Sequence, residues 1–172
     1  MIMSDRIIQN AYYVSDLDLA ITRFHNLWGL GPFFVRRHIG LENVIYRGAP
    51  AELDISAAYT QAGEIMIELV TQHNNAPSVF RDRFSADGNG FHHVALDFGD
   101  HDAQVESFNS RGFESVTSFK TSEGRGATYL DTFDLLGHAT EIYRVNDSLR
   151  ALYAKVRDAA STWNGKDLSI EL

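Results

Sequence analysis

Four polar residues stand inside otherwise apolar stretches of the chain, and their types are those that hold metal ions. They are Gln9, Glu68, His93 and Glu141. An amide oxygen, two carboxylates and an imidazole suit Zn²⁺, Ni²⁺, Co²⁺, Mn²⁺ or Fe²⁺. The chain has no cysteine, so disulfides and thiolate ligands are excluded. If the four side chains converge, the sequence predicts one divalent metal ion with coordination positions free for two substrate oxygens.

Such a site favours one kind of chemistry. A cation would stabilise the oxyanion of an enediolate or enolate, which is the difficult species when a proton is removed next to a carbonyl. A glutamate at the edge of the metal could move that proton. The candidate site therefore predicts proton transfer on a small molecule that carries two neighbouring oxygens.

The positions of these residues follow an internal repeat. Gln9 stands seven residues before Asp16, and His93 stands seven residues before Asp100. Both members of the first pair are shifted by 84 residues to give the second pair. Repetition at a fixed distance indicates two related structural units.

Each unit has the order strand, helix and three strands. Glu68 corresponds to Glu141 with a shift of 73 residues, so the first module is longer by 11 residues, most simply in the loops between Gly29 and Gly63. We expect a single domain over residues 1–172, with modules at about 7–72 and 90–145, a polar linker at about 73–89 and a C-terminal helix at about 147–163.

Local patterns predict the elements of each module. Helical spacing predicts a helix over 17–28, capped by Ser15 and burying Trp28, and another over 100–111. A short helix is expected over 78–84. Strands are predicted at 7–14, 33–39, 43–47, 52–60, 64–71, 91–98, 113–120, 127–133 and 138–144.

Strand alternation places the candidate ligands on common faces with small residues. Alanine stands two residues from three of the four polar residues, which leaves room for a cavity. A slip of one residue would bring His92 inward in place of His93, and the repeat spacing favours His93. Other side chains that could line the cup are Tyr13, Tyr129, Asp131 and Tyr143.

The composition of the chain limits the kinds of partner that it can bind. The net charge of −8 argues against nucleic acid and anionic membranes as partners. The N-terminus lacks the pattern of a signal peptide, and no apolar run is long enough to span a bilayer, so we expect a cytoplasmic protein. Arg36, Arg37 and Arg125 could receive a carboxylate or phosphate, although solvated loop charges are the commoner case. His38 and His73 are expected at the surface.

Four stretches carry a resemblance that extends from Ile7 to Arg144. They are Tyr12–Asp18, Gly29–Phe33, Gly90–Ala95 and Gly137–Tyr143. The chain resembles the vicinal oxygen chelate superfamily, which includes glyoxalase I, methylmalonyl-CoA epimerase, extradiol dioxygenases and bleomycin-resistance proteins. The resemblance implies an α+β fold in which two βαβββ modules form a half-open mixed β-barrel, with flanking helices, around one metal ion.

The resemblance also implies roles for the matching residues. In that family the metal ligands come from the first and last strands of each module, which here are Gln9, Glu68, His93 and Glu141. This set resembles the zinc form of glyoxalase I and implies that Glu141, or alternatively Glu68, is the catalytic acid/base. The implied protein is a homodimeric, metal-dependent lyase or isomerase acting on a small 2-oxo, 2-hydroxy or thioester substrate.

Two alternative functions are compatible with the same fold. Extradiol dioxygenases use two histidines and one carboxylate for iron, and Glu68 stands where their second histidine would be. A non-catalytic protein that binds a hydrophobic ligand is the other alternative, and such proteins usually lack the ligands. The chain has no clear glutathione-binding signature.

Overall fold

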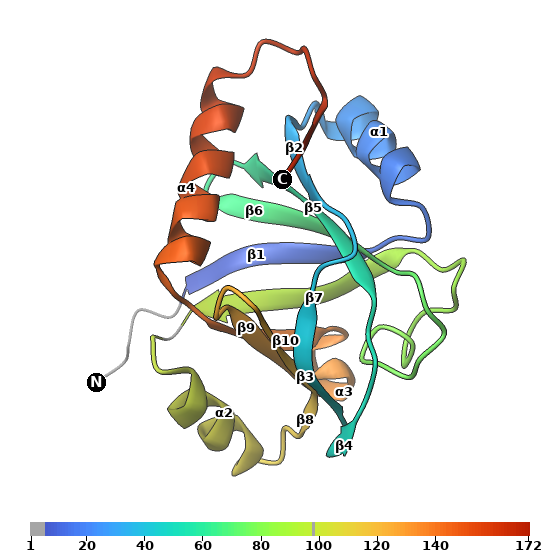
Figure 1. Cartoon of the computed structure of the whole chain (residues 1–172), viewed down its shortest axis with the longest axis vertical. Helices are drawn as coiled ribbons and strands as arrows, with labels where there is room; N and C mark the ends of the chain where they lie inside the picture. Colours follow the sequence, from blue (N-terminus) through green and yellow to red (C-terminus); the bar gives the residue numbers. More distant parts are fainter. Residues whose placement is uncertain (1–5, 98) are drawn as a thin grey trace.

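The computed structural model describes residues 6–97 and 99–172, so residues 1–5 and Phe98, the last residue of one predicted strand, lie outside it (Figure 1). The helices are α1 (Leu17–Trp28), α2 (His101–Asn109), α3 (Phe133–Leu136) and α4 (Asp147–Thr162). The strands are β1 (Arg6–Tyr13), β2 (Phe33–Arg36), β3 (Leu41–Tyr46), β4 (Ala49–Pro50), β5 (Ile55–Ala62), β6 (Ile65–Gln72), β7 (Gly90–Asp97), β8 (Ser115–Thr121), β9 (Gly126–Leu130), β10 (Ala139–Arg144) and β11 (Ser169–Glu171).

The described strands form one curved, unclosed sheet with flanking helices, which confirms the predicted fold class. Its order is β11-β2-β5-β6-β1-β7-β10-β9-β8-β3-β4. In one half β1 pairs in parallel with β6, and in the other β7 pairs in parallel with β10. The first strands of the two halves, β1 and β7, pair with each other in antiparallel fashion. The sheet is therefore two equivalent βαβββ units joined side by side.

The additional residues of the first module include the strands β3 and β4. They pair with each other, and β3 also pairs with β8 of the second module. The pair thus extends the far end of the sheet, beyond β8, which is the outermost strand of the other module (Figure 1). One wall of the barrel is consequently built from both halves of the chain.

The repeated aspartates are helix caps. The side chain of Asp16 accepts a hydrogen bond from the backbone N–H of Leu19 at 2.9 Å, and Asp100 accepts one from Ala103 at 3.1 Å. Both satisfy N–H groups that have no partner within the helix. The predicted cap Ser15 is wrong by one residue, because Asp16 occupies the cap position of α1 and both the N–H and the hydroxyl of Ser15 contact Asn89.

Two other local predictions are wrong. Trp28 is half exposed, since it lies in the last turn of α1 and packs edge-on against Tyr12 and Phe24 instead of entering the core. Residues 78–84 form turns and not a helix, because the 78–82 and 80–84 backbone hydrogen bonds are not continued along the chain.

The linker between the modules contributes to the core. Val79 and Phe80 are fully buried and pack with Tyr13 of the first module and Tyr129 of the second. Helix α4 covers the inner face of β5, where Leu152 is buried in a cluster from that strand and its neighbours. The linker and α4 therefore close the barrel region from different sides.

Candidate metal centre

The predicted ligands lie in two neighbouring rows across the middle of the sheet. Strand pairing places a fully buried alanine between the two polar residues of each row. The rows are Glu68–Ala11–His93 on β6, β1 and β7, and Gln9–Ala95–Glu141 on β1, β7 and β10. Because paired residues point to the same face of a sheet, all four side chains enter the same side. The alanines keep the space between them open.

Three ionisable side chains converge at this point. We call Glu68, His93 and Glu141 the inner cluster. The Nε2 atom of His93 lies 3.3 Å from Oε2 of Glu68 and 3.0 Å from Oε2 of Glu141. All three residues are buried, and one potential ligand atom of each lies within 4.8 Å of the others. The cluster has the composition and compactness of a divalent metal site.

At the inner cluster, His93 Nε2 and one oxygen of each glutamate contact one another but make no well-formed hydrogen bond. Across the part of the chain that the structure describes, seven buried side-chain nitrogen and oxygen atoms make no hydrogen bond. Four of the seven belong to the predicted ligands, namely Gln9 Nε2, Glu68 Oε2, His93 Nε2 and Glu141 Oε2. Burial of polar atoms without partners is costly, and a cation coordinated here would remove that cost. The donor set therefore fits a divalent metal ion.

A β-bulge brings His92 to the same region as His93. The pairing of β1 with β7 passes from Ala11 opposite His93 to Tyr12 opposite Phe91, so His92 is the extra residue. A bulge changes the direction of side chains, which ordinary alternation would send to opposite faces. As a result, both imidazole rings are fully buried, with Nδ1 of each 2.8 Å from Nδ1 of the other.

These contacts fix the tautomers of both histidines. The Nε2–H of His92 donates to the carbonyl oxygen of Val79 at 3.1 Å. His92 Nδ1 is then an acceptor, and His93 Nδ1–H donates to it at 2.8 Å. The Nε2 atom of His93 is left to face the two glutamates. A histidine that ligates a metal is usually held by a second partner in this way.

The charges of the inner cluster are coupled. Burial alone would lower the pKa of His93, but the adjacent carboxylates of Glu141 and Glu68 outweigh burial and raise it to about 9. Burial raises the pKa of Glu68, which His93 partly offsets. Burial and the nearby His93 hold the pKa of His92 well below its usual range, consistent with its neutral tautomer.

Gln9 is held by two tyrosines. Its Oε1 atom accepts hydrogen bonds from the hydroxyls of Tyr143 at 2.7 Å and Tyr153 at 3.2 Å, while its Nε2 atom has no partner. Burial, reinforced by the negative charge of Glu141, raises the pKa of both tyrosines well above the ordinary value, so they remain donors at neutral pH. A ligand role would require the amide of Gln9 to rotate so that its oxygen faces the inner cluster.

A small cavity opens onto the two glutamates. It has a volume of about 50 Å³, and its lining includes Glu68, Glu141, Tyr59, Tyr129 and Tyr143, with the apolar side chains Leu149 and Leu152 of α4. Two of the four predicted cup residues, Tyr129 and Tyr143, thus line it. Tyr13 instead packs against Phe84, and Asp131 lies near Arg47.

Two of the three candidate arginines line the same cavity. Arg36 and Arg125 approach the carboxylate of Glu123 at 3.4 and 3.0 Å, and all but about a fifth of each arginine side chain is buried. Arg37 points elsewhere and pairs with Asp18 and Glu171 at the surface. The cavity therefore combines an acidic floor with a cationic wall.

Sequence reasoning missed the residues that support the inner cluster. Phe80 packs its ring 4.6 Å from that of His92, and Val79 supplies the carbonyl that fixes its tautomer. Tyr59, also missed, lies directly opposite Glu68, in the position that the predicted residue Tyr129 holds opposite Glu141. The apolar pair Val79–Phe80 inside a polar linker was the available signal for the first two.

Comparison with known proteins shows the family of the chain. The chain belongs to the Glyoxalase/Bleomycin resistance protein/Dioxygenase superfamily. The sequence model of this family matches residues 8–129. Members of this superfamily commonly bind a divalent metal ion. Comparison with curated proteins found no match. No helix in the described part of the chain is both long and apolar enough to cross a membrane.

Several solved structures share the fold. A hypothetical protein from Bacillus halodurans is 16% identical, with a TM-score of 0.57, over 84% of this chain and 96% of that chain. Methylmalonyl-CoA epimerase from Mycobacterium tuberculosis is 19% identical, with a TM-score of 0.54, over 88% and 97%. A variant of the Streptomyces coelicolor methylmalonyl-CoA epimerase, in complex with 2-nitronate-propionyl-CoA, is 20% identical, with a TM-score of 0.51, over 80% and 92%. At such identities these likenesses show the fold alone.

Proposed function

We propose that this protein is a metal-dependent lyase or isomerase that transfers a proton at a carbon next to a carbonyl. The observation that carries the proposal is the inner cluster, in which Glu68, His93 and Glu141 direct unpaired buried atoms toward one another beside a cavity. When bound, a divalent ion supplies Lewis-acid stabilisation of the negative charge that develops on substrate oxygens. Gln9 is the fourth proposed ligand.

The glutamates are the proposed acid/base residues. Glu141 and Glu68 both line the cavity, and they stand on opposite sides of His93. Burial raises the pKa of Glu68 toward the range where a carboxyl group both accepts and returns a proton efficiently. His92 holds the tautomer of His93, and Tyr59 and Tyr129, whose raised pKa values keep them protonated, are the proposed hydrogen-bond donors to substrate oxygens.

The cavity favours a small, anionic substrate. A volume of about 50 Å³ holds only the reacting part of a molecule. Arg36 and Arg125 place two guanidinium groups on its wall, and these groups suit a carboxylate or phosphate that would compete with Glu123 for them. We propose a 2-oxo or 2-hydroxy acid, or a thioester whose acyl group enters the cavity.

Exchange of carbon-bound hydrogen in heavy water tests the reaction without knowledge of the product. The purified protein, supplied in turn with Zn²⁺, Ni²⁺, Co²⁺, Mn²⁺ or Fe²⁺, is incubated with small 2-oxo acids, 2-hydroxy acids and acyl thioesters, and NMR follows deuterium incorporation. We expect metal-dependent exchange that falls about 100-fold or more in Glu141→Gln. Lys166→Gln, in the exposed C-terminal segment, is the matched control and should exchange like the wild type.

Other outcomes identify the alternatives. Oxygen consumption with catechols and Fe²⁺, without hydrogen exchange, would replace the proposal with ring-cleaving dioxygenation. A folded protein that takes up none of the five metals, as measured by mass spectrometry, would replace it with binding of a hydrophobic ligand. Metal binding at the inner cluster would instead appear as about one ion per chain that is lost in a His93→Ala, Glu141→Ala double variant.

A further inference from the structure

A second group of ligand-type side chains lies outside the barrel. His38 follows β2, Asp54 precedes β5 and His73 follows β6. Strand β5 is antiparallel to both β2 and β6, so these three strand ends meet at one edge of the sheet. We call His38, Asp54 and His73 the outer cluster. The fold thus brings together three side chains that are distant in the sequence.

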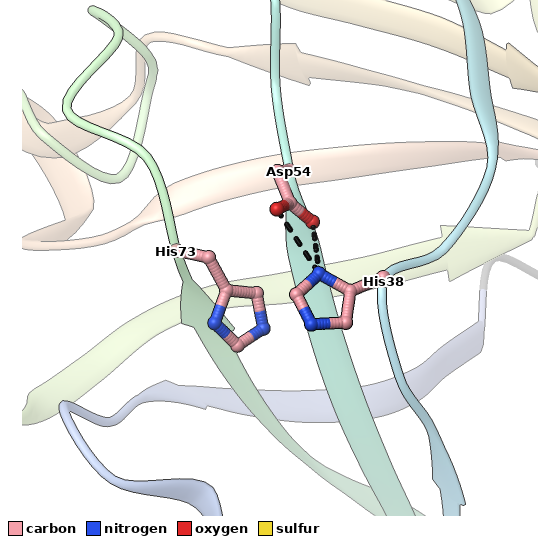
Figure 2. Close-up of side chains that lie close together, drawn as sticks. All are labelled: His38, Asp54 and His73. Atoms are coloured by element: carbon pink, nitrogen blue, oxygen red, sulfur yellow. Dashed lines mark hydrogen bonds and ion pairs between the residues drawn. The ribbon is translucent and has the colours of Figure 1, made fainter.

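The side chains of the outer cluster face one another, as Figure 2 shows. Nδ1 of His38 lies 2.8 and 3.0 Å from the two carboxylate oxygens of Asp54. The rings of His38 and His73 are stacked with their centroids 4.3 Å apart. One potential ligand atom of each residue lies within 4.8 Å of the others, and the group is open to solvent.

A buried serine organises the backbone and side chains around this group. The hydroxyl oxygen of Ser56 accepts from the backbone N–H of His38 at 2.9 Å and lies 2.6 Å from Nε2 of His73. The N–H of His73 donates to the carbonyl oxygen of Asp54 at 2.8 Å. These bonds hold the backbone of the three residues in place and orient the ring of His73 toward that of His38.

Stability of the fold does not account for the outer cluster. His38 adopts a left-handed backbone conformation with φ of 45°, which is costly for a residue with a side chain. An exposed ion pair such as that of His38 with Asp54 contributes at most about 1 kcal/mol. Both features place a second imidazole and a carboxylate beside His73.

From this geometry we propose that the outer cluster binds one divalent transition-metal ion of the Zn²⁺ class, independently of the inner cluster. Two imidazoles and one carboxylate are a donor set that binds Zn²⁺ with one position left for water. The ion would tie the loop after β2 to the ends of β5 and β6. Arg36, Ile39 and Ile55, which are chain neighbours of the cluster, line the cavity, so the ion would also fix part of the cavity wall.

Zinc titration of the full chain, followed by calorimetry and by metal analysis after dialysis, tests this site. We expect His73→Ala to lose one zinc ion per chain relative to the wild type, whatever number the inner cluster holds. Asp54→Asn should weaken the same site at least 10-fold. His38→Gly should lose the ion while remaining folded, because glycine is favoured in the left-handed conformation.

His101→Gln is the matched control. His101 forms a 2.8 Å ion pair with Asp102, and no second histidine completes a cluster with it in the described parts of the chain. This variant should bind zinc as the wild type does. Equal zinc content in the wild type and in folded His73→Ala and His38→Gly would overturn the proposal, and so would an equal loss in His101→Gln. Failure of the inner site alone would leave the one-ion difference intact.

Discussion

In the histidine pair at the centre of the sheet, the position of one proton on each ring decides which nitrogen of His93 faces the glutamates. His93 faces the glutamates with Nε2 because its Nδ1–H is occupied by His92. His92 accepts that hydrogen because its own Nε2–H is occupied by the carbonyl of Val79. Each bond determines the next, so the linker determines which nitrogen reaches the inner cluster.

Removal of the acceptor at position 92 tests this chain of hydrogen bonds. His92→Phe keeps the ring but leaves Nδ1–H of His93 without a partner, so we expect zinc affinity at the inner cluster to fall about 10- to 100-fold. Calorimetry in a His73→Ala background isolates that site. His138→Phe is the control, because it removes a different histidine, which packs against Phe91. The zinc affinity of this variant should be unchanged. Equal affinities in both variants would show that His92 does not set the tautomer.

The raised pKa of His93 predicts a pH dependence for the metal-free protein. The pKa rises from 6.5 to about 9 on folding, so the stabilisation is complete below pH 6.5 and is lost as pH rises through 9. The raised pKa of Glu68 likewise favours the folded state at lower pH, over a range that begins at its ordinary pKa of 4.5. The free energy of unfolding, measured by urea titration in the presence of a chelator, should therefore fall by about 3 kcal/mol between pH 6.5 and 9.

A variant without the imidazole supplies the control for this pH dependence. His93→Asn should be less stable at pH 6.5 and should lose the part of the slope between pH 6.5 and 9 that His93 contributes, whereas His101→Gln should retain the slope of the wild type. A slope in His93→Asn as steep as that of the wild type would assign the effect to other groups. Saturating zinc should abolish the slope, since the metal replaces the proton on His93.

At the scale of helices and strands, the sequence predicted the features that follow a regular repeat. The 84-residue repeat identified equivalent strands, which the structure bears out in β1 and β7, and equivalent aspartates, Asp16 and Asp100, which the structure shows to be the helix caps. The bulge at His92 could not be predicted, because alternation assumes an unbroken ladder. The contacts of Tyr153 with Gln9 were equally hidden, since they depend on how α4 docks.

Helix α4 should stabilise the fold chiefly through its buried face. Leu152 packs against Phe34, Tyr59 and other buried residues, and it also lines the cavity. Leu152→Ala should therefore reduce the free energy of unfolding by about 2–5 kcal/mol. Leu27→Ala on α1 is the control, because that side chain is 74% exposed and should change stability by less than about 0.5 kcal/mol. Urea denaturation measures both, and similar losses would contradict the assigned packing.

At the scale of the whole molecule, one chain supplies the complete inner cluster. The modules meet through β1 and β7, which pair within the chain and place Glu68 and His93 on either side of Ala11. The resemblance in sequence implies a homodimer, which stays a prediction. If modules were exchanged between two copies, each site would combine the first module of one chain with the second module of the other.

Mixing two defective variants distinguishes these arrangements. Glu68→Ala damages the first module and His93→Ala the second, both in a His73→Ala background that removes the outer cluster. In an exchanged dimer, one of the two sites in each mixed pair would join two intact modules, so co-refolding equal amounts would restore about a quarter of the zinc sites. Because the modules pair within one chain, we expect no restoration, as measured by bound zinc per chain after dialysis. Recovery near that fraction would mean that β1 and β7 exchange partners in the dimer.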